Sequence, residues 1–96
     1  SIDLKKAEFM LEHLLEPQAG TVVSVTKFGL FVELDAYPIE GLVRIDDLPD
    51  DRYRFRADEH CLVGLRSRRR FRLGDRLTVE ATNVSLRERR IDFAIA

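Results

Sequence analysis

The chain has 96 residues, of which 45% are hydrophobic, and its 16 Lys and Arg against 17 Asp and Glu give a net charge of -1. A chain of this length buries roughly 60–68% of its unfolded surface, which supports one compact core and excludes a large multidomain enzyme. No apolar run approaches the roughly 20 residues that cross a bilayer, and no secretory signal pattern is recognisable, so we expect a cytoplasmic protein. The single cysteine, Cys61, cannot form an internal disulfide, which agrees with a reducing compartment.

The charges are distributed unevenly along the chain. Residues 1–51 carry 4 basic and 11 acidic side chains, whereas residues 52–96 carry 12 basic and 6 acidic ones. Such a division is typical of a surface that binds a large anion, of which nucleic acid is the commonest. Two oppositely charged faces that pair with each other would give the same counts, so charge alone leaves both interpretations open.

The first segment has helical spacing behind Asp3, a favourable N-cap residue. The apolar positions are Leu4, Ala7, Leu11, Leu14 and Leu15. Pro17 is expected to end the helix. We therefore assign residues 1–16 to an N-terminal helix that packs under the following domain and links it to a preceding one.

Short β-rich runs follow at residues 21–26, 30–34, 41–45, 77–84 and 91–96. Five such runs separated by turn residues predict an all-β fold, a five-stranded antiparallel barrel without exposed edges. Leu30, Val32 and Leu34 alternate with Phe31, so we expect the leucines and the valine inside and an exposed Phe31 outside. Phe28 shares the inward parity unless the backbone is irregular at Gly29, so periodicity leaves its side open.

The same alternation places residues of the other strands. Val79 and Phe93 belong to inward sets, with Leu77, Ala81, Ile91 and Ile95. On the strand at 41–45, Val43 and Ile45 point inward, and Leu42 and Arg44 point outward. On the last strand, Arg90, Asp92 and Ala94 are expected on the outer face, where Arg90 meets solvent.

Residues 49–73 form an insertion that a minimal barrel does not need. Tyr53 and Phe55 alternate with arginines, and later a set of arginines shares one parity, namely Arg66, Arg68, Arg70 and Arg72. Both stretches predict strands of an added β-hairpin, whose guanidinium groups would bind phosphates. The alternative is a basic, solvated flap that faces the acidic half of the chain.

The residues resemble the S1 RNA-binding domain, which has the oligonucleotide-binding (OB) fold. The similarity lies in "GTVVSVTKFGLFVEL" at 20–34, "EGLVRIDDL" at 40–48 and "LGDRLTVEATNV" at 73–84. The motifs "DDRYRF", "FRLGDRL" and "RERRIDF" are similar, more narrowly, to the S1 domain of the ribonuclease R and ribonuclease II family of 3′-to-5′ exoribonucleases. The resemblance covers about residues 5–96. It implies an S1 domain at 17–96 that follows the linker helix.

The resemblance also implies an RNA-binding surface. Its residues are Lys27, Phe28, Phe31, Arg44, Arg87, Arg89 and Arg90, with Arg68, Arg70 and Arg72 of the insertion. Phe28 and Phe31 would both lie on the RNA face, with Gly29 allowing the irregular backbone between them. The sequence departs from the family pattern at Arg44, which stands where a histidine is frequent. Ser85 replaces a common Asp or Asn, and Arg68 replaces a small turn residue.

The chain alone shows no catalytic constellation. Its carboxylate cluster, formed by Asp46, Asp47, Asp50 and Asp51, lacks the pattern of a calcium loop and is expected to be a solvated turn. His60 and Cys61 lack the second pair of ligands that a zinc site requires. We expect no metal or cofactor here, because the resemblance puts the acidic, Mg²⁺-binding nuclease centre in a separate preceding domain.

Three functions from different classes follow. The leading one is a module that holds single-stranded or structured RNA for an attached exonuclease, with weak, salt-sensitive and largely sequence-independent binding. The second is an S1-type module of a translation or transcription factor. The third is a barrel for protein contacts, in which the basic insertion meets an acidic partner.

Overall fold

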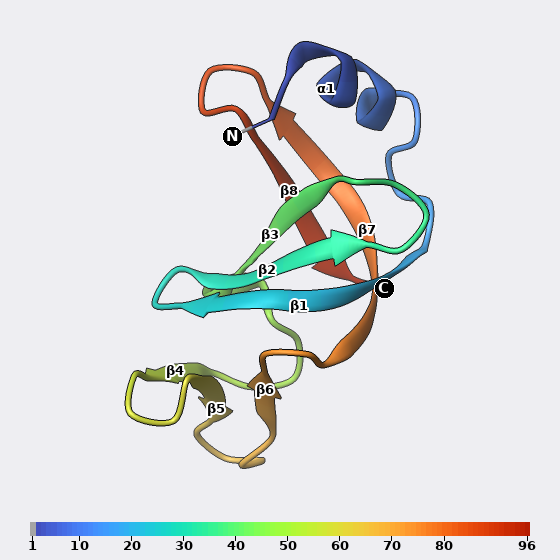
Figure 1. Ribbon diagram of the computed structural model, residues 1–96. Coiled ribbons are helices and arrows are strands. Elements are labelled where there is room, and N and C mark those ends of the chain that lie inside the picture. Colours follow the sequence, from blue (N-terminus) through green and yellow to red (C-terminus); the bar gives the residue numbers. More distant parts are fainter. Residues whose placement is uncertain (1) are drawn as a thin grey trace.

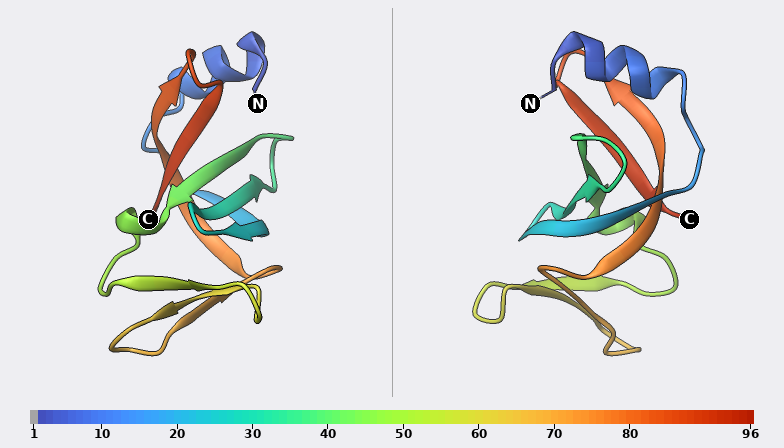
Figure 2. Two further views of the ribbon diagram at one scale, coloured as in Figure 1. Left: turned by 90° about the vertical axis from the view of Figure 1, so that its left-hand side faces the viewer. Right: turned by 45° about the vertical axis from the view of Figure 1, so that its right-hand side comes forward.

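The computed structural model describes residues 2–96, which form a barrel with a helix at one end and a small sheet at the other (Figure 1). The barrel strands are β1 (Gln18–Thr26), β2 (Gly29–Leu34), β3 (Glu40–Arg44), β7 (Arg76–Ser85) and β8 (Arg90–Ile95). The remaining elements are helix α1 (Leu4–Leu11), the 3₁₀ turn η1 (Ile45–Asp47), and strands β4 (Tyr53–Arg56), β5 (Cys61–Gly64) and β6 (Arg70–Arg72). The molecule measures 38 × 21 × 20 Å, and both views in Figure 2 place α1 and β4–β6 at opposite ends of its long axis.

The strands close in the order β1-β2-β3-β8-β7, which confirms the barrel. One pairing differs from the antiparallel prediction, because β3 and β8 run parallel, with Leu42 opposite Asp92 and Val43 opposite Phe93. Parallel neighbours need a long crossover connection. Here the insertion and β7 supply it, so the chain returns beside β3 in the same direction.

The inward residues of the barrel are those that alternation predicts. Leu30, Val32 and Val79 are fully buried, and Phe93 lies among them. Burial of aliphatic and aromatic side chains contributes about 1.5–3 kcal/mol each, so this cluster provides most of the stabilisation. Pairing on both sides of every barrel strand also leaves no open edge for aggregation.

Helix α1 begins as predicted, with the Asp3 carboxylate accepting a hydrogen bond from the Lys6 amide at 2.8 Å. Its buried residues are Ala7, which is one of the predicted apolar positions, and Met10, which is not. The leucines predicted to pack, Leu4, Leu11, Leu14 and Leu15, are exposed. A short helix lying across the end of a barrel buries only a narrow stripe, here the one that holds Ala7 and Met10. Within residues 2–96, no helix is long and apolar enough to cross a membrane.

The helix ends at Leu11, well before Pro17. Leu15 has a left-handed backbone with φ of 64°, and its amide donates to the Ala81 carbonyl oxygen at 2.9 Å. The chain is thus tied to β7 after the helix. No local pattern in the sequence indicates this long-range contact.

The insertion is a three-stranded antiparallel sheet in the order β4-β5-β6, where a two-stranded hairpin was expected. Leu62 and Phe71 are buried and belong to the same apolar cluster as Val22 of the barrel. Residues 65–69 form a turn, so Arg66 and Arg68 do not lie on a strand. The prediction of one strand that carries all four arginines is therefore wrong for the part before Arg70. The insertion is therefore a packed part of the fold, with its turn at the far end of the molecule (Figure 2).

Candidate nucleic-acid interface

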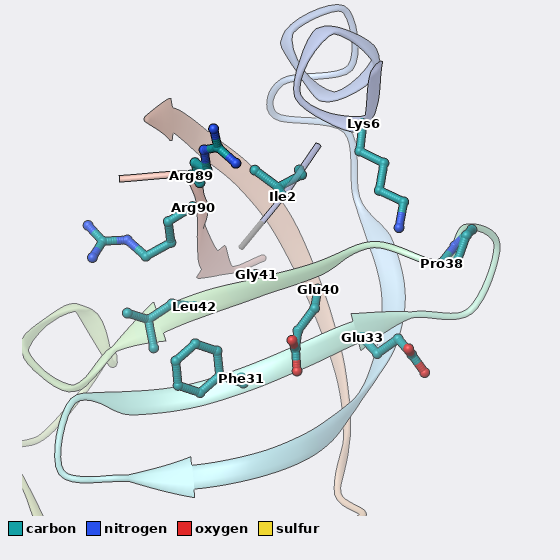
Figure 3. A pocket seen from close by; sticks show the side chains of 10 residues that line it. All are labelled: Ile2, Lys6, Phe31, Glu33, Pro38, Glu40, Gly41, Leu42, Arg89 and Arg90. Atoms are coloured by element: carbon teal, nitrogen blue, oxygen red, sulfur yellow. The ribbon is translucent and has the colours of Figure 1, made fainter. Parts of the chain in front are cut away.

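Strand register brings four side chains into one row across the barrel. Phe31 of β2 pairs with Leu42 of β3, Leu42 with Asp92 of β8, and Asp92 with Asn83 of β7. Phe31 is half-buried, so the prediction of an exposed Phe31 holds only in part, and Leu42 stands on the outer face as predicted but is buried there. The two side chains stand on the same face and cover each other (Figure 3). They form an apolar platform between charged neighbours.

A groove of about 230 Å³ lies over this platform. Phe31 and Leu42 line it from the sheet, Arg89 and Arg90 from the start of β8, and Glu33 and Glu40 from the pair of positions next to the platform. In Figure 3 the Phe31 ring lies between the Arg90 guanidinium and the two carboxylates. Pockets for drug-sized ligands measure about 300–1,000 Å³, so this smaller groove suits a flat group the size of one base.

Arg90 is held in place by two carboxylates. Its Nε donates to Asp92 Oδ1 at 2.9 Å, and its Nη2 lies 2.8 Å from Glu88 Oε2. Asp92 is buried and also accepts from Asn83 at 3.4 Å. Arg90 meets solvent only in part, because it pairs with Asp92, and Asp92 is buried although it stands on the predicted outer face. Arg90 offers an oriented guanidinium whose charge is largely compensated.

Phe28 lies in the turn between β1 and β2 and is 61% exposed, which excludes the core-packing alternative. Gly29 has φ of 143°, and a Cβ there would overlap the Val43 carbonyl oxygen, so only glycine fits this irregular backbone. The Lys27 ammonium lies 5.4 Å from the centre of the Phe28 ring. The turn thus presents a cation and an aromatic ring together.

The other predicted cations of the barrel are exposed at the end of β3 and in the turn before β8. Arg44 is exposed at the end of β3, next to Gly29 in the register. Arg87 and Arg89 are exposed in the turn between β7 and β8. The Ser85 hydroxyl accepts from the Glu88 amide at 3.1 Å and so stabilises that turn.

The arginines of the insertion differ in their surroundings. Arg68 is exposed in the turn with φ of 63°, a conformation that favours the small residue it replaces. Arg72 is also exposed. Arg70 is ion-paired with Glu59 and donates to the Cys61 sulfur at 3.3 Å, so its charge is compensated.

Asp51 fixes the turn that carries these arginines. Its carboxylate accepts from the Ser67 amide at 2.8 Å and the Ser67 hydroxyl at 2.9 Å. These bonds, with others from the Arg52 and Arg66 amides, lower the pKa of Asp51 to about 2. One carboxylate of the acidic cluster is therefore structural. Over residues 2–96, no three His, Cys, Asp or Glu side chains are grouped so that they could hold a metal ion.

Sequence reasoning missed several contributors to the groove, among them Ile2, Lys6 and the pair of Glu33 and Glu40. Ile2 and Lys6 line it from the N-terminal segment, which is held by a hydrogen bond from the Ile2 amide to the Arg89 carbonyl at 3.1 Å. No local pattern indicates this tertiary contact. Glu40 could have been found, because it shares the outward parity of Leu42 and stands opposite Glu33.

The comparisons with known proteins concern the family and the fold of the chain. Residues 18–96 match the family model of the S1 RNA binding domain. The chain is 40% identical over 95 residues to ribonuclease R of Aquifex aeolicus and 42% identical over 93 residues to that of Escherichia coli K12. These alignments cover 99% and 97% of the chain but only 14% and 11% of the relatives. A structure of Mycoplasma genitalium RNase R in complex with ribose-methylated single-stranded RNA matches with a TM-score of 0.92 at 22% identity, covering 95% of this chain and 14% of that one.

Proposed function

This chain belongs to the S1 RNA-binding domain family, and we propose that it holds single-stranded RNA on the face formed by β2, β3 and β8. We place the RNA there because of the groove over Phe31 and Leu42, which has the oriented Arg90 at its side. Exposed Phe28, Lys27 and Arg44 extend the same site around Gly29. Aromatic and cationic groups arranged in this way fit a strand of bases joined by phosphates.

Two physical contributions account for the proposed affinity for RNA, namely base stacking and neutralisation of phosphates. Stacking of a base on an aromatic side chain contributes about 1–3 kcal/mol and tolerates every base. Each phosphate neutralised by a cation adds about -0.7 to the slope of log affinity against log salt. Arg44, Arg87 and Arg89 are exposed and suit the phosphate role, whereas the carboxylate-bound Arg90 orients the nucleotide.

The insertion adds a second, weaker contact in this proposal. Arg68 and Arg72 are exposed and can meet phosphates of a longer RNA. Arg70 contributes less, because Glu59 already compensates its charge. RNA that spans both surfaces would gain affinity mainly through charge.

The whole protein is, in the same proposal, a cytoplasmic 3′-to-5′ exoribonuclease of the ribonuclease R type. Support comes from the identity to ribonuclease R, which extends over nearly the whole chain and includes the α1 segment before residue 18. Residues 1–16 would then link the S1 domain at 17–96 to a preceding catalytic domain. That domain would carry Mg²⁺ and the hydrolytic chemistry, and this one would capture and hold the substrate.

Titration of a labelled oligoribonucleotide at two salt concentrations tests the binding function. We expect affinity to fall as salt rises, and Phe31→Ala and Arg44→Ala each to weaken binding. Absence of salt-dependent binding would remove the RNA function. Unchanged affinity in both variants would move the site to another face.

Sequencing of the gene upstream of Ser1 tests the exoribonuclease assignment. We expect it to encode a nuclease domain with a cluster of acidic residues. A different domain there would leave the RNA-binding module in place and remove its role in RNA decay.

A further inference from the structure

Two glutamates stand directly opposite each other beside the apolar platform of Phe31 and Leu42. Glu33 of β2 pairs with Glu40 of β3, two positions along the strands from the pair of Phe31 and Leu42 and therefore next to it on the same face. Side chains that are opposite each other in an antiparallel pair have Cβ atoms about 4.5–5.5 Å apart, and like charges there are destabilising. Both carboxylates line the groove. A surface that only had to attract RNA would gain nothing from them.

Neither carboxylate is neutralised by a neighbour. None of the ion pairs formed among residues 2–96 includes Glu33 or Glu40. Lys6 reaches the same end of the groove from α1, as Figure 3 shows, but it lies beyond ion-pair distance of both. The two glutamates therefore keep free acceptor oxygens beside a ring on which a base can stack.

Uncompensated negative charge lies on one side of the groove only. Arg90, whose charge Glu88 and Asp92 largely compensate, lies on one side of the Phe31 ring, and the unpaired carboxylates lie on the other (Figure 3). A phosphate is repelled by the carboxylate side, so a nucleotide stacked on Phe31 must direct its base edge there. Carboxylates accept hydrogen bonds and cannot donate them, so they favour exocyclic amino groups and disfavour carbonyl oxygens.

We propose that Glu33 and Glu40 make this groove selective for bases with an exocyclic amino group, and that uracil is disfavoured. Cytosine presents an amino group where uracil presents a carbonyl oxygen, and the two rings are equal in size. The inference rests on the proposed RNA-binding function and adds a base preference to it. Stacking alone would give only a modest difference between these two pyrimidines, and that difference would not depend on Glu33 or Glu40.

Titration of oligocytidylate and oligouridylate of about eight nucleotides, within the ~4–16 that one OB fold covers, tests the preference. At neutral pH the unaltered chain should bind oligocytidylate about three- to tenfold tighter, the ratio that one net hydrogen bond produces. Glu33→Gln and Glu40→Gln should each reduce this ratio, because an amide offers a donor to the uracil carbonyl as well as an acceptor. Glu12→Gln, which removes the same charge from an exposed position on the helix cap, should leave the ratio unchanged.

The possible outcomes distinguish the proposed base preference from the proposed RNA binding on which it rests. Equal, salt-dependent binding of both oligonucleotides would overturn the base preference and leave RNA binding intact. A preference that survives in both glutamine variants would overturn the assignment to these two residues. Absence of binding to either oligonucleotide would count against the RNA function itself.

Discussion

The barrel face and the insertion both carry arginines, but they hold them differently. On the barrel, Arg90 is fixed by Glu88 and Asp92 beside the apolar platform. On the insertion, Arg68 and Arg72 are exposed at the end of the molecule, and no aromatic ring is exposed near them on β6 because Phe71 is buried. The difference indicates two modes of binding. The barrel face orients a nucleotide, whereas the insertion supplies charge.

The largest effect is expected on stability, because the turn beside the barrel face depends on one glycine. Gly29→Ala would force a side chain into the Val43 carbonyl at φ of 143°, so we expect a loss of more than about 3 kcal/mol of unfolding free energy. Gly74 has φ of 88° with no atom within 4 Å of an added Cβ, and Gly74→Ala should cost only about 1 kcal/mol. Chemical denaturation of both variants measures the two losses of unfolding free energy. Equal losses would mean that the turn at Gly29 is not crowded as described.

The next effect is on stacking. Phe31→Ala should weaken RNA binding by about 5- to 150-fold, which corresponds to about 1–3 kcal/mol of lost stacking free energy. Phe31→Tyr keeps the ring and should retain most of the affinity. Fluorescence titration measures both, with a melting curve to establish that the variants are folded. Similar weakening by alanine and tyrosine would argue that the ring itself does not stack.

A smaller effect is expected from the insertion. Arg68→Gly removes an exposed charge while suiting the left-handed turn, so the salt slope should decrease by about 0.7 with little change in stability. Arg70→Gln is the matched control, because Glu59 already compensates this charge. Titrations of a long oligoribonucleotide at several salt concentrations give both slopes. A larger change for Arg70 than for Arg68 would reverse the assignment of free and compensated arginines.

The smallest effect on binding is expected at Asp51. Its pKa of about 2 lies below the usual value of about 3.9, so its contribution to stability is complete above pH 4 and is lost as the pH falls towards 2. Asp51→Asn should lower the melting temperature at pH 7 and flatten the dependence between pH 4 and 2. Affinity for a short RNA at pH 7 should stay nearly the same. Melting curves that keep the steep acid dependence in the variant would show that another group is responsible.

Alternation predicted the inner surface of the barrel because only one face of each strand can enter a closed core. Leu30, Val32 and Phe93 are buried as expected. The same rule failed at Leu42 and Asp92, which stand on the outer face and are nevertheless buried. Leu42 is covered by its cross-strand neighbour Phe31, and Asp92 is covered by Arg90, which stands two residues earlier on the same strand. The parallel pairing of β3 and β8 places Leu42 opposite Asp92.

The helix and the insertion were harder to predict because long-range contacts decide them. The helical spacing indicated a buried stripe of leucines around Ala7, but only Ala7 of that stripe is buried, together with Met10 beside it. The row of alternating arginines indicated a strand, but Asp51 bonds to Arg66 and Ser67 and so holds that segment in a turn. Neither contact is visible in the local sequence.

The central claim is that RNA lies on the outward face of β2, β3 and β8. The most direct measurement is a two-dimensional amide NMR spectrum of the ¹⁵N-labelled chain during titration with a short oligoribonucleotide. We predict the strongest shift changes at Phe28, Phe31, Arg44 and Arg90, with smaller changes at the turn around Arg68. Unchanged signals at the four barrel positions, with saturating changes elsewhere on the chain, would contradict the account.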